Sequence, residues 1–486
     1  MNPVYLTFAI YLLGMIAVGI YFYKKASHLE DYLLGGRSMG SWVTALSAQA
    51  SDMSGWLLMG LPGAIFAAGL GKMWIAVGLA LGTFLNWLLV APRLRLYTEK
   101  THSLTLSTFL GKRFHDPTNS LRLLSAVITL IFFTIYAASG LVSAGKLFES
   151  MFNIDYRMAV IAGTAIMIIY TLMGGFLAVC WTDLFQGLLM FAAITIVPII
   201  AYNQLDAGAF EAACSAKKIS MNLTTTGGLA GFLAIISTMA WGLGYFGQPH
   251  ILVRFMSIKS IKLLPRSMTI AMIWVLISLA AAICIGLLAI PMYNTPEKEK
   301  VFIFMIRDLF NPYVGGVLLA AILAAIMSTI DSQLLVSAST LTEDFYANVI
   351  NKNASEKQQM LISRLSVLLI AIVACSIAMD RNSSILDLVE FAWGGFGAAF
   401  GPVVLMALFS RKTSWRAALS GMLAGTIASL VWKFCPWGVH MYEIVPGFIV
   451  NILVIIAVNQ VFPAQNKTML KEFDSVAKAL KNPKTD

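Results

Sequence analysis

Polar side chains that could bind a cation lie inside a long apolar stretch near the start of the chain. Residues 46–63 read LSAQASDMSGWLLMGLPG, so Asp52 is surrounded by hydroxyl groups and small residues. Small and polar residues weaken the helical hydrogen-bond ladder and can leave backbone carbonyl groups free. Carbonyl oxygens beside a carboxylate suit a small hard cation such as sodium. The alternative is that the serines and glycines serve helix packing and that Asp52 makes structural hydrogen bonds.

A second polar run could complete such a site. Residues 320–339 read AAILAAIMSTIDSQLLVSAS, in which Ser328, Asp331 and Ser332 recur at spacings of three and four. These spacings place the three side chains on one helical face. A face of hydroxyl and carboxylate groups opposite Asp52 predicts a shared cation site. The alternative is that the hydroxyl groups only bond back to their own helix.

A third stretch combines aromatic rings with helix breakers. Residues 236–255 read ISTMAWGLGYFGQPHILVRF, so Trp241, Tyr245 and Phe246 alternate with glycines and precede Pro249. Aromatic faces beside an interrupted backbone predict a pocket for a small, partly apolar solute. Aromatic residues also form belts at membrane interfaces, but these rings cluster within the stretch instead of flanking it. We therefore favour the pocket.

The composition places these runs in a membrane protein. Of the 486 residues, 58% are hydrophobic and 12% are charged, whereas about a quarter of a soluble domain is charged. The net charge of +10 does not indicate nucleic-acid binding, because the charges lie between the apolar runs. A helix needs roughly 20 apolar residues to cross the bilayer. We predict an all-α integral membrane protein with about 13 transmembrane helices, at residues 4–23, 38–66, 73–95, 121–147, 158–178, 183–203, 229–252, 267–291, 313–345, 361–379, 386–409, 415–433 and 443–462.

Basic residues predict how the spans are oriented. An odd number of spans puts the two termini on opposite sides of the membrane. With the N-terminus outside, 24 of the 34 Lys and Arg residues fall in cytoplasmic segments. Because cytoplasmic loops carry an excess of basic residues, we predict an external N-terminus and a cytoplasmic C-terminus. Arg254, which ends the seventh span, is interpreted as a helix terminus at the membrane interface.

The first apolar run has no basic residue before it and no small-residue cleavage site after it, which indicates a retained span and no cleaved signal peptide. The five cysteines show neither metal-ligand spacing nor a paired framework. Cys214 and Cys435 both fall in predicted loops, so a disulfide between these two remains an open alternative.

The interrupted stretches are five spans apart, which suggests an internal repeat. Transporters built from inverted repeats carry discontinuous helices at corresponding positions of their two halves, and they bind solute near the bilayer midplane. We predict a five-plus-five core, with one unit at residues 38–205 and the other at residues 206–410. Residues 1–37, with the first span, and residues 411–486, with the last two spans and a tail, would then be peripheral.

At these stretches the chain resembles the sodium:solute symporter family, in particular its bacterial proline-transporting members. The resemblance extends from about residue 4 to about residue 460, and several matching motifs exceed ten residues. It implies the five-plus-five fold of amino-acid antiporters, a bacterial cytoplasmic (inner) membrane location, and uptake of L-proline coupled to sodium. The similar stretches are EDYLLGGRSMG, TALSAQASDMSGWLLMGLPGAIF, FFTIYAASG, GGFLAVCWTD, WGLGYFGQPHILVRFM, AAILAAIMSTIDSQLLV and FAWGGFGAAFGPVVL.

The resemblance also implies roles for individual residues. Asp52 matches an acid that is required for sodium coupling, and Arg37 and Asp183 match further coupling positions. Ser54 and Gly55, which follow Asp52, are assigned to coupling or gating. The residues that match the main sodium site of the family are Ala50, Met53, Ala325, Ser328 and Thr329. The residues that match the proline site are Tyr136, Trp241, Tyr245 and Pro249.

One residue departs from the pattern of the proline-transporting members, which have serine at the position of Asp331. Some relatives in the family bind a second sodium with the acid of the sixth span and hydroxyl groups of the ninth. Asp183, Ser328, Asp331 and Ser332 could therefore form a second cation site. The alternative is a water-exposed carboxylate at the inner part of the ninth span.

Four other functions compete with proline uptake. The closest is a symporter of the same family for another small solute, such as a sugar, sialic acid, pantothenate or acetate, against which Trp241 and Tyr245 argue. A channel would need a continuous polar pore instead of three local interruptions. A sensor would need a signalling domain, for which no loop is long enough, and no histidine pairs with a nucleophile as an enzyme would require. We expect L-proline and the lipid bilayer as partners and sodium as the co-transported ion, with no nucleic acid and no obligatory protein partner.

Overall fold

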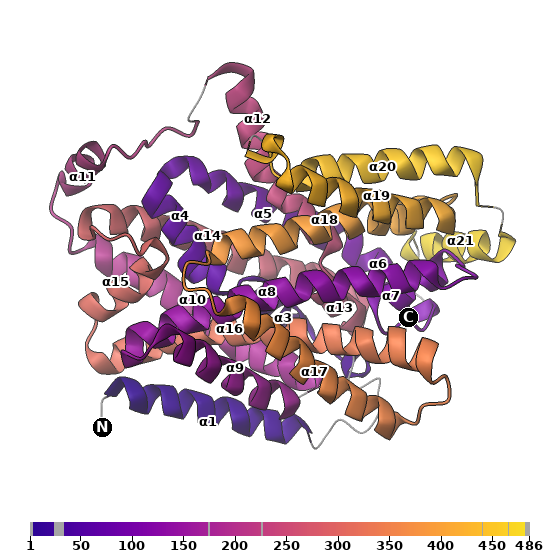
Figure 1. The fold of residues 1–486 in the computed structure, drawn as a ribbon, viewed down its shortest axis with the longest axis horizontal. Helices are drawn as coiled ribbons and strands as arrows, with labels where there is room; N and C mark the ends of the chain where they lie inside the picture. Colours follow the sequence, from indigo (N-terminus) through magenta and orange to yellow (C-terminus); the bar gives the residue numbers. More distant parts are fainter. Residues whose placement is uncertain are drawn as a thin grey trace.

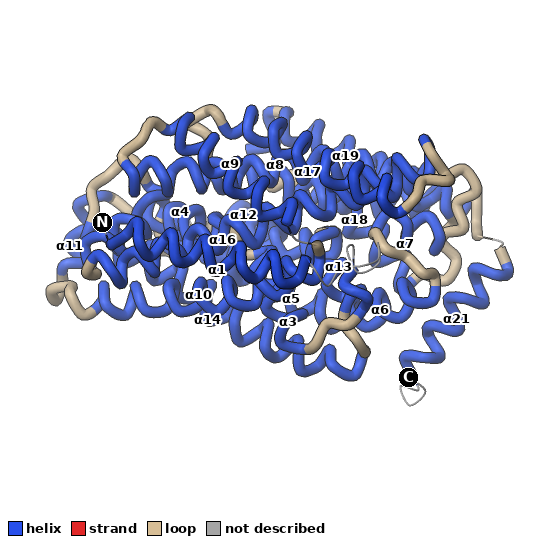
Figure 2. The backbone as a smooth tube through the Cα atoms, turned by 90° about the horizontal axis from the view of Figure 1, so that it is seen from below, coloured by secondary structure: helices blue, strands red, loops and turns tan. Residues whose placement is uncertain are grey.

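The computed structural model is a bundle of helices, most of which run along one long axis (Figure 1). It describes residues 3–23, 34–173, 175–224, 227–439, 441–464 and 466–481. Within these ranges there is no strand, only an isolated bridge between Met39 and Ile258. Figure 2 shows helices throughout the bundle in a second view. Residues 3–23 begin toward the left of Figure 1, and residues 467–481 lie toward the right.

The helices overlap the predicted spans, but the number of thirteen is not confirmed. Eleven of them, among the described residues, are long and apolar enough to cross a membrane, and two shorter apolar helices, Trp56–Ala68 and Tyr156–Leu172, lie in the predicted second and fifth spans. The helices are α1 (Pro3–Tyr23), α3 (Ser41–Asp52), α4 (Leu61–Ala68), α5 (Met73–Leu85), α6 (Ala91–Lys100), α7 (Leu106–Arg113), α8 (Ser120–Phe152), α9 (Tyr156–Met173), α10 (Phe176–Tyr202), α11 (Ala209–Lys217), α12 (Gly228–Met239), α13 (Pro249–Ser257), α14 (Leu264–Met292), α15 (Val301–Leu309), α16 (Pro312–Ser339), α17 (Glu356–Ala378), α18 (Ile385–Phe409), α19 (Trp415–Phe434), α20 (Ile444–Val461) and α21 (Lys467–Lys481).

The centre of the bundle is formed by α16 and α18. In the most apolar part of each, 83% of the residues are buried, against 11% in α1. A helix that is apolar all round must face either a protein core or lipid. Exposed Leu13, Leu88 and Leu369 lie on the outer helices, as lipid contact requires. All five cysteines are free, so the disulfide left open between Cys214 and Cys435 is not formed.

The predicted second span is divided into two helices. The first, α3, ends at Asp52, and Met53 leaves the helical region with a ψ of 76°. A π-helix, Trp56–Gly60, then leads into α4. The helical ladder is therefore interrupted directly beside the buried carboxylate of Asp52, as the small and polar residues of this stretch predict.

The predicted seventh span is interrupted in the same way. After α12 the chain winds into a 3₁₀ helix, η5 (Ala240–Gly247), and Gln248 is extended before α13 begins at Pro249. The residue before a proline is pushed out of the α region, which explains the break at Gln248. Glycines in η5 allow a close helix contact, because a Cβ atom on Gly242 would lie 2.2 Å from the carbonyl oxygen of Gly78 in α5.

Replacing Gly242 by Ala should therefore destabilise the protein by roughly 1–3 kcal/mol, the usual cost of overpacking a well-packed core. The added methyl group meets backbone, which cannot rotate away. Thermal unfolding of the purified protein in detergent measures the change. Gly14→Ala in α1 is the matched control, because nothing lies within 4 Å of its added Cβ. Equal stability of the two variants would show that η5 and α5 are not held in contact.

Candidate functional site

Oxygen atoms converge where the end of α3 meets the middle of α16. The Ser328 hydroxyl lies 2.7 Å and the Thr329 hydroxyl 3.3 Å from the carbonyl oxygen of Ala50. The same hydroxyls are 3.1 Å and 3.2 Å from the carbonyl oxygen of Ala325. All four residues are buried. A hard cation prefers such oxygen ligands, and hydroxyl protons can rotate away to expose lone pairs.

Asp52 links the broken helix to two other elements. The Tyr245 hydroxyl in η5 donates a hydrogen bond of 2.5 Å to its Oδ2 atom. The backbone carbonyl of Asp52 accepts hydrogen bonds from the Trp56 indole at 2.9 Å and from the Tyr136 hydroxyl in α8 at 3.3 Å. Its Oδ1 atom is buried and has no partner among the described residues. Asp52, at the end of α3, is therefore hydrogen-bonded to three aromatic side chains, those of Trp56, Tyr136 and Tyr245.

The aromatic residues form a chain of ring contacts around α18. The Trp393 ring lies 5.1 Å from that of Tyr245 and 6.5 Å from that of Tyr136, both edge to face. The Trp393 indole donates a hydrogen bond of 2.7 Å to the carbonyl oxygen of Trp241. The structure thus connects three of the four predicted solute residues. Pro249, the fourth, is buried at the start of α13, directly after η5.

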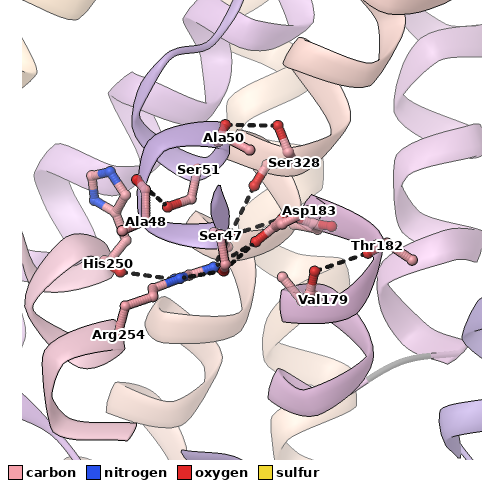
Figure 3. A network of polar contacts seen from close by, with 12 residues as sticks. Ser47, Ala48, Ala50, Ser51, Val179, Thr182, Asp183, His250, Arg254 and Ser328 are labelled. Atoms are coloured by element: carbon pink, nitrogen blue, oxygen red, sulfur yellow. Dashed lines mark hydrogen bonds and ion pairs between the residues drawn. The ribbon is translucent and has the colours of Figure 1, made fainter. Parts of the chain in front are cut away.

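A second polar network lies one turn away from the first (Figure 3). Arg254 in α13 donates hydrogen bonds to the Asp183 carboxylate in α10 at 3.1 Å and to the Ser332 hydroxyl at 2.5 Å. The Ser47 hydroxyl in α3 donates to the same Asp183 oxygen at 2.7 Å. Ser332 in turn lies 3.4 Å from the Asp331 carboxylate. The network therefore joins α3, α10, α13 and α16 at one point.

Polar contacts also join helix ends at two further places. At one of them Glu299 accepts a hydrogen bond of 2.5 Å from Lys146 in α8 and one of 2.9 Å from the backbone N–H of Ile385 in α18. At the other Arg37 donates to the carbonyl oxygens of Met256 at 2.7 Å and Ser103 at 2.9 Å. Arg37 thus links the end of α13 to the segment before α7.

The residues after Asp52 are packed against α8. Ser54 and Gly55 are both buried, and the Ser54 hydroxyl lies 3.4 Å from the backbone N–H of Trp56. A Cβ atom on Gly55 would come within 2.4 Å of the Ser143 hydroxyl. The break therefore fits closely against α8, and a larger residue at Gly55 would displace it.

Comparison with known proteins identifies the family. The model of the sodium:solute symporter family matches residues 32–425. The chain belongs to this family. Its relatives are transporters and not enzymes.

Curated relatives in the family are similar over nearly the whole chain. The "Sodium/proline symporter" of Haemophilus influenzae is 46% identical over 99% of both chains. The "High-affinity proline transporter PutP" of Bacillus subtilis is 46% identical over 95% of this chain and 98% of its own. The "Sodium/proline symporter" of Escherichia coli is 45% identical over 97% of this chain and 96% of its own.

Solved structures show the same fold in more distant transporters. A substrate-bound, outward-open Na+-coupled sialic acid symporter has a TM-score of 0.81 at 21% identity, over 95% of this chain and 98% of its own. MhsT in complex with L-phenylalanine has a TM-score of 0.56 at 14% identity, over 86% of this chain and 97% of its own. The symporter therefore has the helical transporter fold of these proteins.

Two residues of the symporter's polar and aromatic networks were missed in the sequence. Arg254 is only 1% exposed and binds Asp183, so its interpretation as an interfacial helix terminus was wrong. Trp393 lies in the FAWGGFG motif, but no pattern indicated that it would join Tyr136 to Tyr245.

Proposed function

We propose that this symporter couples the inward movement of sodium to the uptake of L-proline by alternating access. The observation that carries the proposal is the position of Asp52. It follows by two residues the Ala50 carbonyl that meets Ser328 of α16, and its carboxylate accepts a hydrogen bond from Tyr245 of η5. Relatives named as proline transporters that are 45–46% identical over nearly the full chain support proline as the cargo.

Sodium is assigned to the junction of α3 and α16. Its ligands would be backbone oxygens of Ala50, Met53 and Ala325 and the hydroxyl groups of Ser328 and Thr329. Asp52 supplies negative charge two residues from Ala50 and orients the break through its bond from Tyr245. Bound sodium would fix this break in one conformation, and proline would bind best to that conformation. Coupling needs only that both ligands prefer the same state.

Proline is assigned to the aromatic residues Tyr136, Trp241, Tyr245 and Pro249, together with Trp393. The rings suit the apolar pyrrolidine, and the free oxygen of Asp52 suits the ammonium group. Because proline carries no net charge, its co-transport with sodium is electrogenic whether one or two sodium ions move with it. The membrane potential contributes about 2.3 kcal/mol per charge per 100 mV, which allows proline to accumulate.

The interrupted helices support the five-plus-five arrangement, with units at residues 38–205 and 206–410. Both breaks, after Asp52 and at Gln248, precede a short helix, α4 and α13 respectively. An external N-terminus and a cytoplasmic C-terminus in the bacterial inner membrane complete the proposal. Residues 24–33, in the connection after α1, lie outside the described residues.

Uptake of labelled L-proline into proteoliposomes tests the function. An inward sodium gradient should drive accumulation, whereas an equal potassium gradient should not. Accumulation should rise when the inside of the vesicle is made negative. Sodium-independent uptake, or competition by a sugar, sialic acid, pantothenate or acetate in place of proline, would overturn the assignment of cargo.

The Asp183, Asp331 and Ser332 cluster is proposed as a second cation site. Together with Arg254 it holds two carboxylates and one guanidinium, which leaves one negative charge for a monovalent cation. The Oδ1 atom of Asp183 and the Oδ2 atom of Asp331 are buried without partners in the part of the chain that the structure describes. These two oxygens would be its ligands.

Replacing Asp331 by Ser should therefore lower the Hill coefficient for sodium from near two to near one, since one of two coupled sites is lost. The measurement is proline uptake against sodium concentration. Asp155→Asn, at an exposed position, is the control and should keep the wild-type coefficient. A coefficient near one in the wild-type protein and in the Asp331 variant would remove the second site.

A further inference from the structure

His250, in the first turn of α13, is fully buried, and neither of its ring nitrogens has a partner among the described residues. Its backbone carbonyl accepts a hydrogen bond from Arg254, but its ring points away from the guanidinium (Figure 3). A neutral imidazole always carries one N–H donor, and buried donors in proteins are nearly always paired. The ring therefore marks a place for a polar group that the protein itself does not supply.

His250 also borders the aromatic residues assigned to the cargo. Its ring centroid lies 6.0 Å from that of Tyr136 and 5.4 Å from that of Phe133. It directly follows Pro249, at the start of the helix after the η5 break. The unpaired nitrogens are thus next to the proposed solute pocket and not in a separate part of the core.

Three other polar rings of this pocket already donate to protein atoms. The Tyr136 hydroxyl donates to the backbone carbonyl of Asp52, and the Tyr245 hydroxyl donates to the Asp52 carboxylate. The Trp393 indole donates to the carbonyl oxygen of Trp241. Asp52 can only accept when it is ionised. Two polar rings, those of Trp393 and His250, contact the Tyr136 ring, and of these His250 has a ring N–H without an acceptor.

An amino acid in this pocket presents two charges of opposite sign. Its ammonium group needs acceptors, which the free oxygen of Asp52 provides. Its carboxylate needs donors, and a hydrogen bond to a carboxylate is stronger than one between neutral groups. We propose that His250 is a specificity-determining residue that donates an N–H hydrogen bond to the carboxylate of the transported amino acid. This inference rests on the proposed function, because it takes an amino acid as the cargo.

The test compares ligand binding by the wild-type protein and by two variants of the full-length chain. His250→Phe keeps an aromatic ring without a donor, and His250→Gln keeps an N–H donor without the ring. Titration calorimetry of the purified proteins gives the dissociation constants of L-proline and of L-prolinamide at saturating sodium, and that of sodium alone. L-prolinamide retains the amine but lacks the carboxylate.

His250→Phe should weaken proline binding about 30-fold, the size expected for a lost hydrogen bond to a charged group. It should change the affinities for sodium and for L-prolinamide less than threefold, and His250→Gln should recover most of the proline affinity. Equal losses for proline, prolinamide and sodium would show a packing role and overturn the proposal, as would unchanged proline binding. His250→Leu serves as a second donor-free variant if the Phe variant does not fold. Failure of the wild-type protein to bind proline would instead contradict the proposed function.

Discussion

Replacing Asp52 by Asn is expected to weaken the apparent sodium affinity of proline uptake by roughly 30- to 150-fold. The Asp52 carboxylate is fully buried and lies two residues after the Ala50 carbonyl of the proposed sodium site. A unit charge about 6 Å from a bound cation contributes roughly 2–3 kcal/mol at an effective dielectric constant of about 20. A free energy of about 1.4 kcal/mol is a factor of ten in an equilibrium constant, which gives the stated range.

The measurement is the sodium dependence of labelled proline uptake in proteoliposomes that contain equal amounts of folded protein. Asp155→Asn makes the same chemical change at an exposed position before α9 and should behave as the wild-type protein. Tyr245→Phe removes the hydroxyl that binds Asp52 and keeps the ring, so it should weaken sodium affinity less than Asp52→Asn. Sodium affinity that is unchanged in Asp52→Asn would show that the carboxylate does not act on the cation.

Much of the central site could be predicted from the sequence because its signals are local. A carboxylate among serines and glycines in an apolar run predicts a break, and the chain leaves the helix at Met53. Ser328 and Thr329 begin the polar run that follows the apolar first part of α16, and both meet the Ala50 carbonyl. Each of these features follows from the cost of placing polar groups in a membrane core.

The contacts between distant segments could not be predicted in the same way. Periodicity indicates which face of a helix is polar, but not which other helix lies opposite to it. Trp393 is separated by 152 residues from the Trp241 carbonyl that it binds. The burial of Arg254 depends on α10 and α3, which supply Asp183 and Ser47, and a basic residue at the end of an apolar run is usually interfacial.

Replacing Arg254 by Leu is expected to destabilise the folded protein by roughly 3–5 kcal/mol, the cost of breaking a buried ion pair from one side. Arg254 and Asp183 are 1% and 0% exposed, and the guanidinium also binds Ser47 and Ser332. Its loss would leave Asp183 and Asp331 as buried carboxylates with no compensating charge nearby. Thermal unfolding of the purified protein in detergent, with and without sodium, measures the effect.

The lower stability of Arg254→Leu could come from the unpaired carboxylate or from the missing side-chain volume. Removing the negative charge of Asp183 as well separates these two causes. Arg254→Leu combined with Asp183→Asn should be more stable than Arg254→Leu alone, because the unpaired carboxylate, and not the missing side-chain volume, is then the main cost. Arg266→Leu, at an exposed position in α14, makes the same substitution outside the network and should change stability little. If sodium restores stability to Arg254→Leu more than to the wild-type protein, the cation is entering the cluster that the guanidinium has left. Additive effects of the two substitutions would instead show that Arg254 and Asp183 do not interact.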